Sequence, residues 1–361
     1  MIHMSRPQQI KYTLLASAVA IACWGMPLSL SGKASDLNRQ LAIPINNGTL
    51  NAQRRQADQY VSEGQAQVKA GELKAAAESW QAALAIYRQI KDMQAQGEIY
   101  EALGDLYADL EMFNESEEAM RRRLGIAREI DDFQGQIFAS NALAEMLLRR
   151  NKPAEAGQIA ADGLLIAQDV KNAKGIGLSL SNMGRAANGI REYDRALDYF
   201  ERAVQSQREA QDFVGQARSQ NYWGDAWRGV RNYKEAAGAY QIGLLLAERV
   251  KDNATVDHAL EGLALSYEGQ GQSGSALRYL SDRLAVAQKA GDGRLELRAL
   301  RSLASYYRRN QDLLQTEKLY GQGVLVAQRI GAKDEELFLS RQLEDLRLRL
   351  SLQRSGQLFQ R

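Results

Sequence analysis

Apolar and small side chains recur along this chain at a constant spacing of forty residues. In each unit a glycine or alanine lies within a first stretch of helical periodicity, usually with large apolar residues one position before it and three after it. These small residues are Gly64, Gly104, Ala144, Gly184, Gly224, Ala264 and Ala304. Spacings of three and four place such residues on one stripe of a helix, and the small residue allows a second helix to approach closely.

A second apolar stretch follows in each unit. Twelve residues after the small residue comes another small position, and a bulky side chain usually returns four residues later, as at Trp80, Met120, Phe200 and Tyr240. This spacing predicts a second helix packed antiparallel on the first. A unit of this size cannot bury its apolar face alone and must share it with its neighbours.

Short turns rich in helix-breaking residues lie between the two helices of a unit. Gly189, Gly229 and Gly269 begin three of them. We expect these glycines to adopt the left-handed conformation that ends a helix. No alternating run within the units marks a strand. The sequence therefore predicts an all-α, right-handed α-solenoid of seven helix-turn-helix repeats over residues 53–332.

The pattern resembles the tetratricopeptide repeat family, in which a large apolar residue, Gly or Ala and an aromatic residue precede a second Ala and a second aromatic residue. The resemblance covers all seven units. The common member of the family has about 34 residues. The forty-residue unit is similar to the longer-helix branch that includes kinesin light chain and the G-protein-signalling modulator adaptors.

Residues 333–361 follow the last repeat. From Leu337 to Leu352, apolar residues recur at helical spacing with many charged residues between them. A solenoid needs a polar terminal unit to cover its open end. We therefore expect a solvated capping helix and a short tail here, on a repeat domain that is soluble and monomeric.

Residues 1–34 have the layout of a secretory signal peptide or an N-terminal membrane anchor. Arg6 and Lys11 precede an uncharged run over residues 13–30, and small residues follow up to Ala34. A signal peptide has this order of segments. The eighteen residues of the run are also just enough to span a bilayer as a helix.

Two further interpretations of this segment stay open, namely a lipoprotein attached through Cys23 and a cytoplasmic protein with a buried N-terminal helix. Residues 35–52 are polar and predict a linker between the membrane segment and the repeats. We expect the repeats to be membrane-anchored or exported, with the membrane side left unassigned.

The amino-acid composition limits which catalytic and metal-binding sites the repeats could form. The only cysteine lies in the N-terminal segment, and His258 is the only histidine within the repeats. This scarcity argues against disulfide frameworks, zinc clusters and catalytic sets with two histidines. A formal net charge of +2 gives no reason to expect nucleic-acid binding. We therefore expect no enzyme activity, no cofactor and no metal.

The resemblance also implies a binding surface. In that family the first helix of each repeat lines a concave groove, with exposed positions three before, one after and four after the small residue. The candidate residues at these positions are Asn141, Ser181, Arg185, Asn188, Asn221, Asp225, Arg228, Arg301 and Arg308. Asparagine amides can pair with a peptide backbone, and arginines can clamp a carboxylate. The alternative is that these residues only keep the groove solvated.

Charge is unevenly distributed along the predicted groove. The second repeat is acidic at Glu98, Glu101, Asp105 and Asp109, whereas the last repeat is basic at Arg298, Arg301, Arg308 and Arg309. A polarised groove would fix the direction of a bound segment, although charge runs are often ordinary solvated faces. The spacing of Trp223 and Trp227 favours the core for both, with a stacking or ligand-anchoring role as the alternative.

The leading functional hypothesis is a non-enzymatic scaffold that holds extended segments of partner proteins in this groove. By family analogy it would serve as an assembly factor for a membrane complex. The alternative is a peptide-responsive regulator or sensor whose solenoid changes shape when it binds its ligand.

Overall fold

The computed structural model describes residues 52–358, and this range consists of helices joined by short turns. The helices are α2 (Ala52–Ala70), α3 (Leu73–Gln89), α4 (Met93–Asp109), α5 (Phe113–Glu129), α6 (Phe133–Arg149), α7 (Pro153–Asp169), α8 (Ala173–Gly189), α9 (Tyr193–Glu209), α10 (Phe213–Gly229), α11 (Tyr233–Val250), α12 (Asn253–Gly269), α13 (Ser273–Ala290), α14 (Gly293–Arg309), α15 (Leu313–Arg329) and α16 (Lys333–Leu358). The expected all-α solenoid is therefore confirmed.

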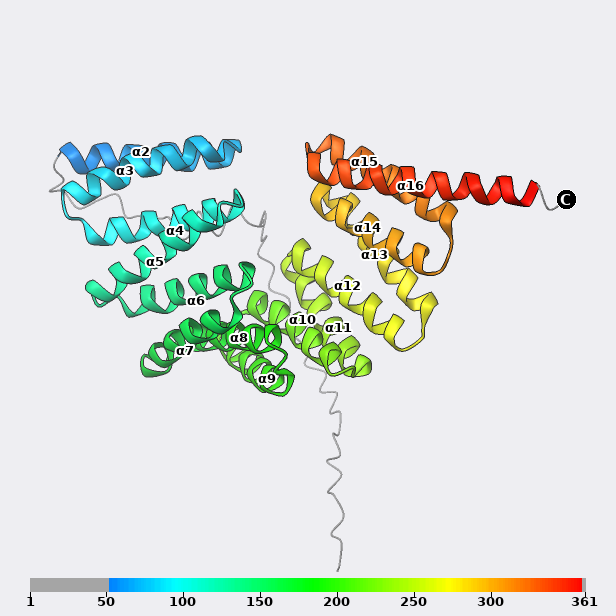
Figure 1. The fold of residues 1–361 in the computed structure, drawn as a ribbon. Helices are drawn as coiled ribbons and strands as arrows, with labels where there is room; N and C mark the ends of the chain where they lie inside the picture. The colour runs from blue at the N-terminus through cyan, green and yellow to red at the C-terminus, as the bar shows by residue number, and fades with distance from the viewer. Residues whose placement is uncertain (1–51, 359–361) are drawn as a thin grey trace, which may run out of the picture.

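Helices α2 to α15 pair into seven repeats, and α16 follows them. The pairs stack into an arch in which α2 to α6 form one arm and α12 to α16 the other (Figure 1). The arms approach each other at one point, where the guanidinium of Arg294 on α14 lies 3.9 Å from the carboxylate of Glu111, in the turn after α4. Repeats two and seven therefore face each other across the arch.

The predicted signal peptide or anchor over residues 1–34 lies outside the described residues, as does most of the linker. Between residues 52 and 358, no helix combines the length and the apolar character needed to cross a bilayer.

The close contact predicted between the two helices of a repeat is present. An added Cβ at Gly64 would lie 2.4 Å from the Trp80 side chain, and one at Gly184 would lie 2.7 Å from the Phe200 ring. Both aromatic rings are completely buried. The bulky residue of the second helix therefore packs directly against the small residue sixteen positions before it. A larger side chain at the small position would separate the two helices.

An aspartate or asparagine at six of the repeat boundaries caps the helix that follows. The side chain of Asp92 accepts a hydrogen bond from the backbone N–H of Ala95 at 3.1 Å. The equivalent caps are Asp132, Asn172, Asp212, Asp252 and Asp292. Such a cap satisfies one of the backbone donors that the first turn of a helix leaves free.

The turn glycines differ from the prediction. Gly189, Gly229 and Gly269 are the last residues of their helices, and the left-handed residue lies two positions further on. An added Cβ at Gly229 would lie 2.3 Å from the Tyr193 ring. At Gly229 the glycine is thus required by close packing between repeats.

The turns themselves recur every twenty residues with one left-handed residue each. Ten of these residues are not glycine, and the four glycines are Gly71, Gly271, Gly291 and Gly331. The following N–H closes the turn in each case, as when Asp92 donates to the carbonyl of Tyr87 at 2.9 Å. This is the hydrogen bond of a Schellman helix end.

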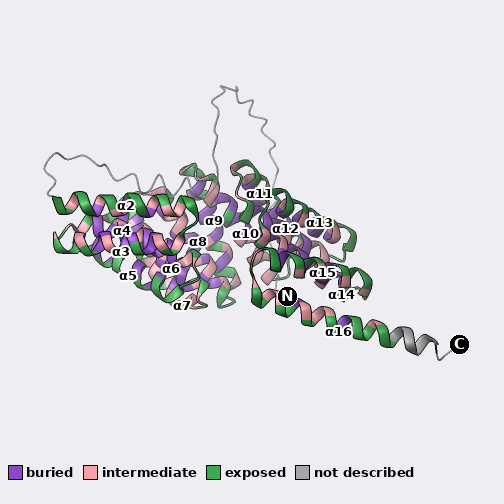
Figure 2. Cartoon of the chain, turned by 90° about the horizontal axis from the view of Figure 1, so that it is seen from above, coloured by how far each residue is buried: buried purple, intermediate pink, exposed green. Residues whose placement is uncertain are grey.

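Buried side chains run through the interior of the stack (Figure 2). At the two ends of the solenoid they form extended apolar clusters, one over α2 to α5 and one over α12 to α16. Between these ends the apolar clusters are smaller. Trp223 and Trp227 belong to them, as expected from their spacing.

The glycine contacts lead to a stability prediction. An added Cβ at Gly262 would lie 2.2 Å from the ring of the buried Tyr240, so Gly262→Ala should destabilise the protein by about 1–3 kcal/mol through overpacking. Gly238→Ala in α11 meets nothing within 4 Å and should instead stabilise its helix by about 0.5–1 kcal/mol. Thermal unfolding followed by circular dichroism compares the two. Equal effects of both variants would contradict the packing argument.

Candidate functional site

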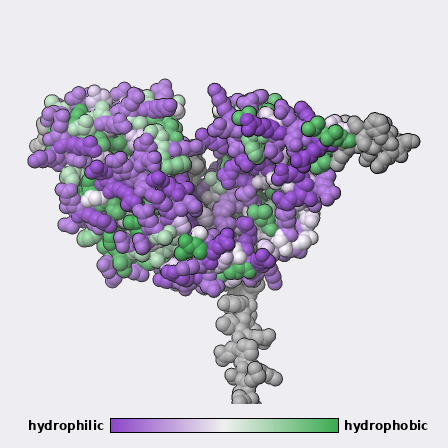
Figure 3. Space-filling view, viewed as in Figure 1, coloured by the Kyte–Doolittle hydropathy of each residue, from purple (hydrophilic) through white to green (hydrophobic). Residues whose placement is uncertain are grey.

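The inner face of the arch is hollowed between the two arms (Figure 3). Two cavities open on it. One of about 250 Å³ is lined mainly by α8 and α10, together with the turn between α6 and α7. The other, of about 350 Å³, lies between α12, α13 and α14. Both are lined largely by first helices of repeats, so the candidate site lies on the predicted side of the solenoid.

Three candidate residues are not on this surface. Asn141 is 1% exposed, Ser181 is 6% exposed and Asn221 is 0% exposed, so their prediction as exposed groove positions was wrong. Asn141 donates through Nδ2 to the Ser179 hydroxyl at 2.8 Å. Asn221 donates through Nδ2 to the Thr255 carbonyl at 2.8 Å. These bonds join neighbouring repeats, which gives the residues a structural role.

The reason for this burial is the second helix of the same repeat. Opposite Asn141 stands Gly163, and opposite Asn221 stands Gly243, where an added Cβ would lie 2.1 Å from the Asn221 Oδ1. The glycine leaves a space that the amide fills. In these two repeats, therefore, the position three before the small residue faces the second helix, whereas in the last repeat Arg301 is exposed although Gly323 holds the equivalent place in the second helix.

In two other repeats the same two positions hold a large basic residue in the second helix and an acidic residue in the first. Arg123 and Arg283 replace the glycine, and acidic residues stand opposite them in the first helix. Arg123 lies 3.3 Å from Glu101, and Arg283 lies 2.8 Å from Glu261. The size and charge of the two positions thus vary together, and this pairing was a signal that sequence analysis missed.

Arg185 and Asn188 do lie on the groove, beside the smaller cavity. The Arg185 guanidinium stacks on the Tyr222 ring at 4.6 Å from its centre and donates to Asn182 Oδ1 at 3.2 Å. Within the described residues, no carboxylate lies within ion-pair distance of it. Asn188 Oδ1 is buried and has no hydrogen-bond partner there. The cavity therefore offers a cation that has no ion-pair partner, although its charge helps to lower the pKa of Glu145, and an acceptor that has no hydrogen-bond partner.

Asp225 and Arg228, by contrast, belong to a closed network. Asp225 accepts hydrogen bonds from the Tyr240 hydroxyl at 2.6 Å and from Arg228 at 3.3 Å, and lies 3.0 Å from His258 Nε2. Burial alone would raise the pKa of Asp225, but His258, Tyr240 and Arg228 together lower it. Arg228 is thus occupied and does not form the free carboxylate clamp that the sequence suggested.

At the acidic end of the groove, burial and neighbouring acids disfavour the charged form of the carboxyl groups. Burial raises the pKa of Asp105 to about 7, and the negative charges of Glu101, Asp109 and Glu145 add to this effect. Burial also raises the pKa of Glu98 on the same helix. These carboxyl groups therefore repel each other, and the surface favours a cation.

The basic end is largely neutralised by neighbours. Arg298, Arg301 and Arg309 lie within 3.3 Å of acidic side chains, namely those of Asp257, Glu335 and Glu268 respectively. Arg308 is exposed, and no ion pair of it is present in the part of the chain that the structure describes. The predicted polarity of the groove is thus carried more by its acidic end than by its basic end.

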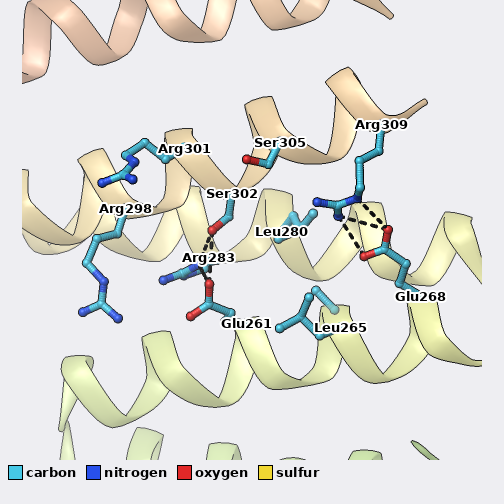
Figure 4. Close-up of a pocket in the computed structure, with 11 residues that line it drawn as sticks. Glu261, Leu265, Glu268, Leu280, Arg283, Arg298, Arg301, Ser302, Ser305 and Arg309 are labelled. Atoms are coloured by element: carbon cyan, nitrogen blue, oxygen red, sulfur yellow. Dashed lines mark hydrogen bonds and ion pairs between the residues drawn. The ribbon is translucent and has the colours of Figure 1, made fainter. Parts of the chain in front are cut away.

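The larger cavity lies in this basic region (Figure 4). Leu265 and Leu280 lie in its middle, between Arg298 and Arg301 at one end and the ion pair of Arg309 and Glu268 at the other. The fully buried Arg283 bridges Asp257, Glu261 and the Ser302 hydroxyl at 2.5–2.8 Å. Arg283 holds α12, α13 and α14 together and has little capacity left for a ligand.

Sequence reasoning placed Glu98 and Arg298 in the groove but missed the row to which they belong, six positions before the small residue. Each is half-buried or exposed: Glu98, Phe138, Leu178, Arg218, His258 and Arg298. One helical turn separates this row from the position three before the small residue, so helical periodicity alone was a signal for it. Among residues 52–358, no group of three potential ligand side chains is placed to hold a metal ion.

No sequence family and no curated protein matches this chain. Solved structures do. The apo form of RapI has a TM-score of 0.58 and 17% identity, covering 76% of this chain and 99% of that one. A signal-transduction ATPase with a tetratricopeptide repeat sensor from Pyrococcus horikoshii has a TM-score of 0.56 and 15% identity, covering 78% of this chain and 44% of that one.

A Rap protein complexed with Competence and Sporulation Factor has a TM-score of 0.53 and 13% identity, covering 83% of this chain and 99% of that one. Identities this low establish a common fold and nothing more specific. Together with the seven helix pairs and their small-residue contacts, they show that this chain has the fold of the tetratricopeptide repeat proteins.

Proposed function

We propose that this protein is a non-enzymatic binding protein that holds an extended peptide segment of a partner on the inner face of its arch. The observation that carries the proposal is Arg185, which lies on the Tyr222 ring without a carboxylate partner among the described residues. The unpaired Asn188 Oδ1 lines the same cavity. A segment with a carboxylate and a free backbone N–H would satisfy both groups.

The acidic end supplies a second anchor. Holding Asp105 beside three other acids lowers stability at neutral pH, a cost that a purely structural surface does not require. Lysine or arginine side chains of a partner would remove this repulsion. The bound segment therefore carries basic residues over α4 and an acidic residue at Arg185, which fixes its direction along the groove.

The fold is consistent with this role. One similar structure is a Rap protein complexed with Competence and Sporulation Factor, and another carries a repeat sensor. The likeness covers 83% and 78% of this chain, respectively. We extend only the general role of a ligand-binding solenoid from those proteins to this one.

A specific observation also favours the alternative role as a ligand-responsive regulator. Three polar atoms on α10, namely Gln216 Nε2, Gln220 Oε1 and Asn221 Oδ1, are buried without a hydrogen-bond partner in the described part of the chain. Each such group weakens the packing around it. The middle of the solenoid is thus easier to deform than its apolar ends, and a ligand bound at Arg185 would act directly on it.

We further propose that the repeats are held at a membrane or exported, as an assembly factor would be. The support is the uncharged run over residues 13–30.

The first prediction concerns the cavity. Peptides selected by display against the full chain should bind at least tenfold more weakly after Arg185→Gln with Tyr222→Leu, because a charge-assisted hydrogen bond is worth about 1.5–3 kcal/mol. Fluorescence anisotropy measures the affinities, and circular dichroism checks the fold.

The matched control changes exposed residues of second helices, with Arg202→Gln, Arg208→Gln and Lys289→Gln. Loss of binding in the control set but not in the cavity variant would move the site to the outer face.

A second prediction concerns pH. Because the pKa of Asp105 is about 7, its charge appears as the pH rises through 7, and a selected basic peptide should then bind more tightly. As the pH rises, the free energy of unfolding should change in the opposite direction to the peptide affinity. The pKa of this group is raised by folding, so its contribution to the free energy of unfolding falls between about pH 4 and 7.

Asp105→Asn should remove both pH dependences and raise the unfolding temperature at pH 8. Asp169→Asn, at an exposed position at the end of α7, is the control. An unchanged pH profile in Asp105→Asn would show that other groups cause it.

A third prediction concerns location. The full chain should sediment with membranes or lose its N-terminus near Ala34. Fractionation followed by N-terminal sequencing tests this. A soluble cytosolic chain that retains Met1 would contradict both the anchor and the signal peptide.

A further inference from the structure

Helix α16 has the register of a first helix, but no helix follows it within residues 52–358. Its buried residues Leu339 and Leu346 belong to the apolar cluster of the last repeat. Counting forty residues from Ala304 places Glu344 at the position of the small residue. In every earlier repeat an antiparallel second helix covers this side of the first helix.

Four positions of the register contact that second helix elsewhere in the chain. They lie seven before the small residue, three before it, at it and four after it. The contacts are Gly177 with Gln207, Asn221 with Gly243, Gly224 with Tyr240, and Arg228 with Tyr240. In these repeats the four positions mark the face on which the second helix packs. In the last repeat the first and third do so, at the buried Leu297 and Ala304, whereas Arg301 and Arg308 are exposed.

In α16 the same positions hold Leu337, Arg341, Glu344 and Leu348, and Leu352 continues the stripe. Leu337 is 53% exposed, Leu348 59% and Leu352 63%. Arg341 and Glu344 are exposed, and the structure shows no ion pair for either in the residues it describes. A purely solvating cap, as the sequence predicted, has no need for three leucines on its outer face.

The stripe is complementary to itself when read in the opposite direction. Leu337 and Leu348 lie equally far from its midpoint, as do Arg341 and Glu344. Two antiparallel copies of α16 would thus place Leu337 against Leu348 and Arg341 against Glu344, whereas Leu352 would lie opposite Lys333 of the other copy. A two-fold axis requires this self-complementarity.

We propose that α16 is a dimerisation helix, and that the α16 of a second copy packs antiparallel on it where earlier first helices carry their second helix. The dimer replaces the monomer expected from the sequence. The symmetric part of the stripe, from residue 337 to residue 348, is about 16 Å long at 1.5 Å per residue. An interface of this length lies at the low end of stable interfaces, so the dimer should dissociate at micromolar concentrations.

Cysteine crosslinking of the full chain tests the proposal. The chain carries Cys23→Ser, so that only introduced thiols remain, and two differently tagged copies are co-expressed. Leu337→Cys in one copy and Leu348→Cys in the other should form a disulfide between copies under mild oxidation. Either variant alone should crosslink at least tenfold less, because identical residues lie about 16 Å apart along an antiparallel pair.

Charge reversal supplies an independent measure of the same contact. Arg341→Glu should reduce the crosslink at least fivefold by placing it against Glu344 of the second copy, and adding Glu344→Arg should restore it. The control reverses the pair Asp345 and Arg349, which lie 2.8 Å apart within one helix, and should leave the yield unchanged.

Three outcomes would overturn the proposal. Strong crosslinking of either single variant would mean a parallel pair. The lack of any crosslink between the two variants would mean that another protein or solvent covers this face. Equal yields for Arg341→Glu and its restored double variant would mean that the charges are not in contact.

Discussion

The whole structure depends on how closely two helices approach at one small residue in each repeat. Where that residue is glycine, as at Gly184, the Phe200 ring packs directly against it. The contact fixes the register of the second helix on the first, and the constant repeat length carries that register from one unit to the next. Equivalent positions therefore align along the inner face, which is why scattered residues such as Glu98, Arg218 and His258 form a row.

Periodicity was sufficient to predict the fold, because helix length, small residues and capping aspartates recur with one spacing. It was not sufficient for the site. Whether a given position is exposed depends on a partner in the second helix, and that partner changes between Gly163, Gly243 and Arg283. A position that is a buried asparagine in one repeat is a paired glutamate in another. Reading the two positions together would have separated these cases.

The charges, too, were only partly predictable from the sequence. The acidic cluster around Asp105 lies on one helix and was visible in the sequence. The neutralisation of the basic end was not, because its acidic partners come from elements further along or on neighbouring helices, such as Glu335 on α16 and Glu268 on α12. Local patterns predict where charges stand, whereas the field that a ligand meets depends on contacts across repeats.

The left-handed residue in each turn has a consequence for how such a chain can change over time. Lysine, glutamate, arginine and asparagine all occupy it, although the conformation costs a residue other than glycine about 1 kcal/mol. The turn is therefore imposed by the helices on either side, whatever residue stands there. A gene that gains or loses whole units of forty codons would leave every remaining turn intact. An insertion of a few codons within a helix would instead disturb the contacts of that repeat with the units beside it, because each repeat contacts only its neighbours.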